Sequence, residues 1–298
     1  MNARLNALAA IALAAAGTPA AAQNANQCNL SISPSGAATV SGYDALAGAA
    51  FTAPLPLRIT NDGSVACAGS ITFDARRNND RLRGPRNGTF AYLIVQENNP
   101  SQTLFDPLTG QNAGIPVMVA PGATIEIRPQ LFVEGGQRGQ SGRYEASVEL
   151  TYRNGQGQPR PVTATAILAA DVVPSVQANF VGLDGGTGSS ATLALGELST
   201  GLKRSIGLQL RANTDVDVAV SSENRGRLVR QGGGGDIRYD LEIGGGQVNL
   251  QQDDMVKLDL GADSVRGSTK SMEVEVGNIN RAPAGFYRDT VTFRISGR

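Results

Sequence analysis

Apolar and polar residues alternate along most of the chain with a period of two. In the segment 144–152, Tyr144, Val148 and Leu150 fall on one side, while Glu145 and Glu149 fall on the other. Such alternation is typical of a β-strand that buries one face. The pattern recurs at 55–60, 125–128, 208–211, 216–220, 273–276 and 287–295. Clusters of Gly, Asn and Asp separate these segments, and no segment after residue 22 has a helical repeat. The pattern predicts an all-β protein made of antiparallel β-sandwiches.

Two parts of the chain resemble each other. Residues 142–150 and 285–293 both read G-x-Y-x-x-[ST]-V-x-[LF], at an offset of 143 residues. Weaker matches pair 90–94 with 237–241 and 57–61 with 208–213, in the same order. A duplicated domain accounts for this common order and similar offset. We therefore expect two tandem domains, 23–170 and 171–298, both antiparallel β-sandwiches.

The first 22 residues have the pattern of a signal peptide. Arg4 precedes an apolar stretch at 5–16, and Ala20-Ala21-Ala22 forms an A-x-A cleavage site before Gln23. The stretch is too short to span a bilayer, although an N-terminal membrane anchor is the alternative. No later stretch is long and apolar enough to span, so we expect no stable membrane span.

Composition excludes most catalytic chemistry. The chain has no His, which removes Ser-His-Asp and Cys-His catalysis and His-containing zinc sites. Its 26 basic and 26 acidic residues give no net positive charge to attract nucleic acid. Paired carboxylates could serve a glycosidase, but most acidic residues alternate with apolar ones on predicted strands, and only 5% of residues are aromatic. We predict a protein that is not an enzyme and has no cofactor or metal.

The two cysteines, Cys28 and Cys67, are most simply paired in an exported protein. Their disulfide would close a loop of about 40 residues and stabilise the fold by about 4 kcal/mol through chain entropy. A pair of free, buried thiols is the alternative.

The motifs resemble those of one family. Cys28, the segment 41–44 (SGYD), a strand ending in Asn61, Cys67, the segment 104–110 (LFDPLTG) and the segment 141–144 (SGRY) resemble the spore coat protein U-like domain of archaic chaperone–usher pilus subunits. The segment 284–291 (AGFYRDTV) is similar to the last-strand motif of that family. The resemblance covers 27–168 and 175–298. The second half lacks both cysteines, so its assignment depends on the terminal motif and the duplication.

The resemblance implies an immunoglobulin-like sandwich that lacks its last strand, which a neighbouring pilin supplies as a donor strand. It also implies a periplasmic pilus chaperone and an outer-membrane usher as partners. The first half continues through Val162, Ala164, Ala166 and Leu168, a segment that could supply the missing strand in cis. The second half ends three residues after Ile295, so we expect it to accept a donor strand.

Only Gln23 to Gln27 precede Cys28, and they lack the alternating apolar pattern of a donor strand. A complete first domain, an acceptor domain and no donor arm describe a two-domain tip adhesin. We expect export through the periplasm to the cell surface, in a fimbrium, with a role in attachment and biofilm formation. The alternatives are a structural pilin, a secreted coat or matrix protein of the same family, and a periplasmic pilus chaperone.

Two loops are candidates for binding the target, a surface or glycan that the sequence does not identify. The first is an adhesive loop with Leu104, Phe105, Pro107 and Leu108, whose alternative is an ordinary structural element of the family. The second is an arginine-rich loop that could bind phosphate, carboxylate or lipopolysaccharide, and whose alternative is a solvated loop. Its members are Arg76, Arg77, Arg81, Arg83 and Arg86.

Overall fold

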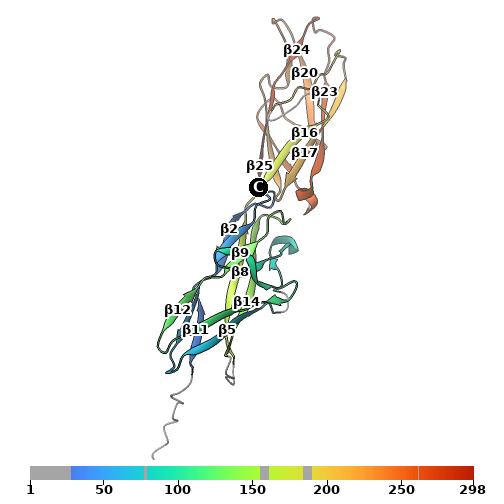
Figure 1. Ribbon diagram of the computed structural model, residues 1–298. Helices are drawn as coiled ribbons and strands as arrows, with labels where there is room; N and C mark the ends of the chain where they lie inside the picture. The colour runs from blue at the N-terminus through green and yellow to red at the C-terminus, as the bar shows by residue number, and fades with distance from the viewer. Residues whose placement is uncertain (1–27, 77–78, 155–160, 184–189, 261) are drawn as a thin grey trace, which may run out of the picture.

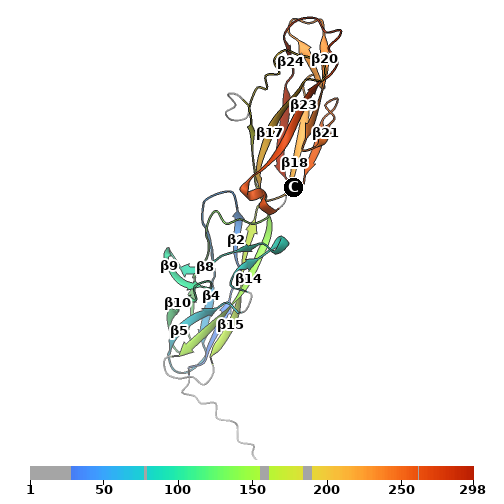
Figure 2. The same ribbon diagram turned by 90° about the vertical axis from the view of Figure 1, so that its right-hand side faces the viewer.

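The computed structural model describes residues 28–76, 79–154, 161–183, 190–260 and 262–298. The predicted signal peptide and the residues just before Cys28 lie outside this part of the chain. Two elongated β-sandwiches stand end to end, joined by residues 173–175 (Figures 1 and 2). The described residues form strands and loops apart from two short 3₁₀ turns, which confirms the predicted all-β class. Within the described ranges, no helix is long and apolar enough to cross a membrane.

The described residues of the first body form fifteen strands and the 3₁₀ turn η1 (Pro85–Asn87). In chain order the strands are β1 (Leu30–Pro34), β2 (Ala38–Tyr43), β3 (Phe51–Pro54), β4 (Leu57–Asn61), β5 (Cys67–Asp74), β6 (Leu82–Arg83), β7 (Thr89–Phe90), β8 (Leu93–Gln96), β9 (Asn99–Asp106), β10 (Gln111–Asn112), β11 (Ile115–Val119), β12 (Thr124–Ile127), β13 (Gln130–Val133), β14 (Gly142–Asn154) and β15 (Val162–Val172).

Three sheets enclose the core of this body. One has the order β11-β5-β14-β15-β2, with β6 beside β14 and β7 beside β6. The others are β1-β4-β12 and β10-β9-β8-β13-β3. Pro56 separates β3 from β4, and Pro129 separates β12 from β13. Because proline has no N–H to donate to the ladder, these positions interrupt the strands and divide one bent layer into two sheets.

The core of the first body lies between these layers. Tyr144, Val148, Leu150 and Tyr152 of β14 are fully buried in it. An aromatic group fills the end nearest the second body, where the ring of Phe90 lies 4.4 Å from that of Tyr144, centroid to centroid. Strand β15 runs antiparallel to β14 and parallel to β2, so both of its edges are hydrogen-bonded.

In the second body the described part of the chain forms ten strands and the 3₁₀ turn η2 (Ala262–Arg266). The strands are β16 (Val176–Val181), β17 (Lys203–Ala212), β18 (Val216–Ser222), β19 (Arg227–Arg230), β20 (Asp236–Ile243), β21 (Gly246–Val248), β22 (Asp254–Leu258), β23 (Ser268–Val276), β24 (Tyr287–Arg288) and β25 (Val291–Gly297). They form one sheet in the order β16-β17-β23-β20-β19-β24, with β21 beside β20, and another in the order β22-β18-β25.

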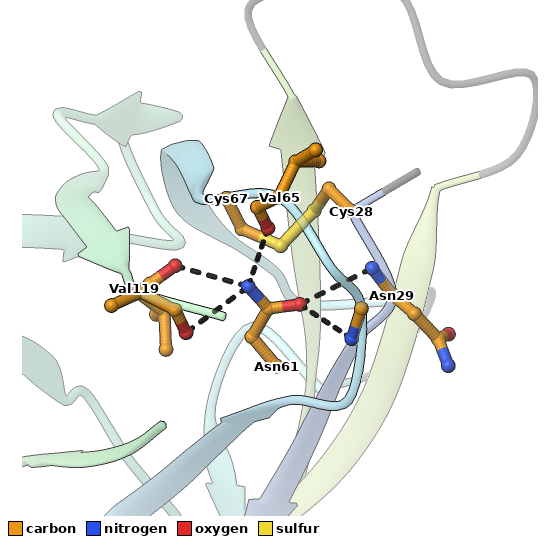
Figure 3. The surroundings of a disulfide bond; sticks show 8 residues. Cys28, Asn29, Asn61, Val65, Cys67 and Val119 are labelled. Carbon is orange, nitrogen blue, oxygen red and sulfur yellow. Dashed lines mark hydrogen bonds between the residues drawn. A yellow bond between two sulfur atoms is a disulfide. The ribbon is translucent and has the colours of Figure 1, made fainter. Parts of the chain in front are cut away.

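Cys28 and Cys67 form a disulfide at the end of the first body that faces away from the second (Figure 3). The bond connects Cys28, two residues before the start of β1, to the first residue of β5, and the two strands belong to different sheets. It therefore fastens the start of the described chain to the opposite layer.

Next to the disulfide, the buried side chain of Asn61 joins the loops at this end (Figure 3). Its Oδ1 accepts hydrogen bonds from the backbone N–H groups of Asn29 (3.3 Å) and Gly63 (3.0 Å). Its Nδ2 donates to the carbonyls of Val65 (2.8 Å) and Val119 (3.1 Å). One buried polar side chain thus provides hydrogen-bond partners for backbone groups of several segments.

Removing the disulfide should destabilise the first body. We expect the double variant Cys28→Ser/Cys67→Ser to lose about 2–5 kcal/mol of unfolding free energy, because the unfolded chain regains the entropy of the opened loop. Thermal melting and the yield of exported protein would both fall. Reductant added to the native protein should reproduce the melting shift and leave the double variant unaffected. An unchanged melting temperature and yield would contradict a structural role for the bond.

Candidate functional site

The repeated motif locates an unpaired strand edge in the second body. At the offset of 143 residues, β14 of the first body corresponds to β24 and β25 of the second. Strand β14 is flanked by β5 on one side and β15 on the other. Strand β25 pairs with β18 alone, and no strand among the described residues pairs with its other edge. The first body's order β11-β5-β14-β15-β2 is matched by β22-β18-β25, with no described counterpart of β15 or β2.

The inner face of β25 is less covered than its counterpart. Val148, Leu150 and Tyr152 of β14 are fully buried, but the equivalent side chains Val291, Phe293 and Ile295 of β25 are only partly buried. We call these three residues, together with Phe180, the open edge.

The whole second core shows the same difference. Among the described residues, the first core has 33 buried hydrophobic residues and 8 partly buried ones packed against them. The second core has 17 and 14. A β-strand laid beside β25 would remove the outer part of this apolar surface from water, which is favourable by about 25 cal/mol per Å².

Phe180 forms the opposite wall of the open edge. It belongs to β16, the edge strand of the facing sheet, and its ring lies 5.4 Å from that of Phe293 in an edge-to-face arrangement. The chain after β16 contains Leu193, Leu195 and Leu198, all partly buried, within a segment that has no strand among residues 190–202. In the first body, the chain after β1 forms β2, the strand that closes the sheet against β15. The site thus combines an apolar inner face with unpaired backbone groups, the two features that bind an added β-strand.

Asp289 holds the segment that leads from β24 into β25. Its carboxylate accepts hydrogen bonds from the hydroxyls of Tyr239 (2.5 Å) and Ser222 (2.6 Å) and from the backbone N–H groups of Asn224 (3.0 Å) and Thr290 (2.8 Å). Burial, together with this carboxylate, raises the pKa of the Tyr239 hydroxyl, so the hydroxyl remains a donor. The network ties the break between β24 and β25 to β18 and β20. Asp289 was not predicted as a site residue from the sequence, although an acidic residue among alternating apolar positions was a usable signal.

The four residues expected to form a strand in cis lie on β15. Ala166 and Leu168 are buried, and Val162 and Ala164 are partly buried against the same core. Their neighbours Thr163, Thr165 and Ile167 are exposed, so the four side chains share the inward face.

The structure corrects the candidate adhesive loop. Leu104 and Phe105 belong to β9, are each 5% exposed and contribute to the first core. They are buried because the apolar residues here are the end of a strand, and the turn begins only after Asp106. The carboxylate of Asp106 accepts from the N–H of Leu108 (2.9 Å) and the hydroxyl of Thr109 (2.8 Å), an ordinary turn. Of the four candidates, Leu108 is 46% exposed, and Pro107 borders a shallow hollow of about 300 Å³.

The arginine-rich loop is not a set of free guanidinium groups. Arg76 pairs with Glu149, Arg83 with Asp80 (3.6 Å) and Arg86 with Asp215 of the second body (3.4 Å). Carboxylates therefore already neutralise three of the five expected anion ligands. Arg77 lies outside the described residues, and Arg81 is partly buried.

Comparison with known proteins finds distant matches among solved structures alone. No family model matches the sequence, and no curated protein matches it. A chain from a chaperone–tip adhesion subunit complex of the archaic Csu pili of Acinetobacter baumannii is 12% identical, with 90% of this chain and 100% of that chain covered and a TM-score of 0.41. A tip adhesin of Pseudomonas aeruginosa is 10% identical, with coverages of 89% and 93% and a TM-score of 0.34. A chain from a chaperone–tip adhesin complex of CFA/I fimbriae is 9% identical, with coverages of 88% and 96% and a TM-score of 0.35.

The difference in burial between the inner faces of β14 and β25 can be tested by replacing an equivalent valine in each strand. We expect Val148→Ala to lower the unfolding free energy of the first body by about 2 kcal/mol, because it removes two methyl groups from a filled core. Val291→Ala should lower that of the second body by less than half as much, because that side chain is already partly hydrated. Denaturant titration monitored by circular dichroism measures both. Equal losses would show that the inner face of β25 is as covered as that of β14.

Proposed function

We propose that this chain is a non-catalytic surface adhesion subunit at the tip of an archaic chaperone–usher pilus, with a role in attachment and biofilm formation. The observation that carries the proposal is the contrast between β14, which pairs with β15 of its own chain, and β25, whose outer edge pairs with no strand among the described residues. In this proposal, residues 23–170 form the adhesive domain and residues 171–298 the domain that accepts a donor strand from a neighbouring pilin.

In this proposal the open edge is covered by two partners in turn, a chaperone and then a pilin donor strand, and the usher exchanges one for the other. An exposed apolar strand edge aggregates unless something covers it. A periplasmic chaperone would cover β25 first, and the outer-membrane usher would then exchange the chaperone for the donor strand of a pilin. Because β15 already occupies the corresponding place in the first body, only the second body needs such a partner.

Adhesion would take place at the end of the first body that carries the disulfide. This end lies opposite the second body, so it remains free when the second body is joined to a fibre (Figure 1). It presents Val65, 37% exposed, in the loop after Asn61, and Met118, 74% exposed, on the edge strand β11. Since Asn61 holds the carbonyls of Val65 and Val119, these loops are pre-organised to meet a surface.

The open edge can be tested with a strand taken from the same chain. A copy of residues 156–172 added after Arg298 would form a hairpin with β25. The copied Val162 would lie opposite Ile295, in the same way that Val162 of β15 lies opposite Tyr152 of β14. Leu168→Ser in the copy avoids placing a leucine opposite Asp289. We expect the second body to melt at a higher temperature and to bind less of a hydrophobic dye, because the added strand covers the open edge.

The matched control carries Ala164→Asp and Ala166→Asp in the added copy, which places charges on the inward face. This control should melt like the chain without the extension. If the extension leaves both the melting temperature and the dye binding of the second body unchanged, the acceptor proposal is wrong.

The adhesive end can be tested by replacing its exposed apolar side chains. We expect Val65→Ser/Met118→Ser to reduce retention of the purified protein on hydrophobic surfaces several-fold, since both side chains are exposed and make no part of the core. Ile167→Ser is the control, because Ile167 is 50% exposed on the outer face of β15, away from this end. All variants should keep the native melting temperature. Equal retention of the double variant and the native protein would move the adhesive surface elsewhere.

A further inference from the structure

The junction between the two bodies shows how a strand and the sandwich that follows it are arranged on a neighbour. Strand β15 pairs with β14 and leaves the first body at Val172, where it lies opposite Gly142. After residues 173–175 the chain enters the second body at β16. The second body therefore stands over the end of the first body where the G-x-Y motif of β14 begins (Figures 1 and 2).

Backbone groups and one ion pair make the contact between the bodies. The N–H of Ser141, just before the motif, donates to the carbonyl of Asn213 (2.8 Å). The side chain of Asn213 accepts from the N–H of Ser175 (2.7 Å) and donates to the carbonyl of Val173 (2.8 Å), which fixes the linker. Arg86 adds its ion pair with Asp215.

The second body has an end that corresponds to this end of the first body, since its own G-x-Y motif begins there. Its motif begins at Gly285, beside β24, on the side away from the first body (Figure 1). The pole consists of Pro283, Ala284, Gly285 and Phe286, all exposed, and of the turn after β19, whose Gln231 N–H donates to the carbonyl of Phe286 (2.8 Å). We call this surface the far pole. At the repeat offset, Ala284 corresponds to Ser141 and Phe286 to Arg143.

Phe286 of the second body lacks the contact that the equivalent residue of the first body, Arg143, makes with β15. In the first body, Arg143 lies opposite Asp171 of β15 and pairs with it at 3.0 Å. In the second body the same position carries Phe286, whose side chain is 83% exposed. An aromatic ring in water at the place where the first body contacts its own last strand is typical of an interface residue.

The backbone of the far pole is held in place. Arg230 donates from Nε to the carbonyl of Ala284 (3.0 Å) and from Nη1 to that of Gly233 (3.2 Å), so it joins both loops of the pole. A Cβ at position 285 would lie 2.5 Å from this Nε, which explains the glycine there. The exposed ring of Phe286 therefore projects from a fixed loop.

We propose that the far pole is the docking surface for the sandwich of the subunit that donates its strand to the open edge, with Phe286 as the main contact. This inference rests on the proposed function. A donor strand antiparallel to β25, as β15 is to β14, leaves the groove at Tyr287 and Phe286. The first body blocks the opposite end of the second body. The donor's own sandwich must therefore stand over the far pole, as the second body stands over the first, and present an apolar surface to Phe286.

Tryptophan reporters test this, because the native sequence contains no tryptophan. Three single variants carry Phe286→Trp at the far pole, Phe293→Trp in the open edge, or Met118→Trp on the first body as a remote control. Each is made in the native chain, in the chain extended by a copy of residues 156–172, and in the chain extended by a copy of residues 156–298. Both copies carry Leu168→Ser. The longer extension adds the strand, the linker and a third sandwich.

We expect Phe293→Trp emission to shift to the blue with either extension. Phe286→Trp emission should shift only when the third sandwich is present, and Met118→Trp emission should not shift. If Phe293→Trp shifts but Phe286→Trp keeps the emission of exposed tryptophan with the third sandwich, the far pole is not a docking surface. A shift of Phe286→Trp with the strand alone would also overturn the inference, because the contact would then be with the strand.

Two further outcomes contradict the proposal in other ways. If Phe293→Trp shifts with neither extension, no strand enters the open edge, and the proposed function fails together with this inference. If Phe286→Trp in the native chain shifts to the blue as protein concentration rises, the far pole binds a second copy of this chain.

Discussion

The pairing of β14 with β15 is the interaction on which the difference between the two bodies depends. It extends from Gly142 opposite Val172 to Tyr152 opposite Val162 and covers the inner face of β14. The second body repeats the preceding strands and the G-x-Y motif, yet within the described part of the chain β25 pairs with β18 alone. One additional strand therefore separates a sandwich with a closed core from one whose apolar residues are partly hydrated. The other features of the second body, the Asp289 network and the clamped far pole, hold β25 in place while its edge is unpaired.

Each body has a buried asparagine that fixes the chain just before its first strand, but one lies at the free end of the first body and the other at the junction. Asn61 ends β4 and holds the chain just before β1, while Asn213 follows β17 and holds the linker just before β16. In the first body this amide fixes loops at the free end, beside the disulfide. In the second body it fixes the junction, and its backbone carbonyl also receives the N–H of Ser141. The second body has no cysteines, and the linker and Asn213 together fasten its first strand.

Much of the fold was predictable because strands of a half-buried sheet leave a period-two pattern. Val162, Ala164, Ala166 and Leu168 were assigned to one face in this way, and they lie on the inward face of β15. The same reasoning failed for Leu104 and Phe105, because a short apolar run does not reveal where a strand ends and its turn begins. Ion pairs between distant segments, such as Arg76 with Glu149 and Arg86 with Asp215, left no local signal. The exposure of Phe286 could not be predicted either, since it depends on tertiary structure: no strand among the described residues lies beside β25 as β15 lies beside β14.

The antiparallel arrangement of β14 and β15 also determines how the molecule would respond to tension. A pull applied between the disulfide end and the second body passes along β15, whose last residue leads into the linker. Force directed along a strand loads all the hydrogen bonds of its ladder at once, in shear, instead of opening them one after another. Strand β15 has such a ladder on both edges. A donor strand that enters the open edge antiparallel to β25 and leaves toward its own sandwich would be loaded in the same way. The chain would then transmit mechanical force through two strands in series, each held in its most resistant direction.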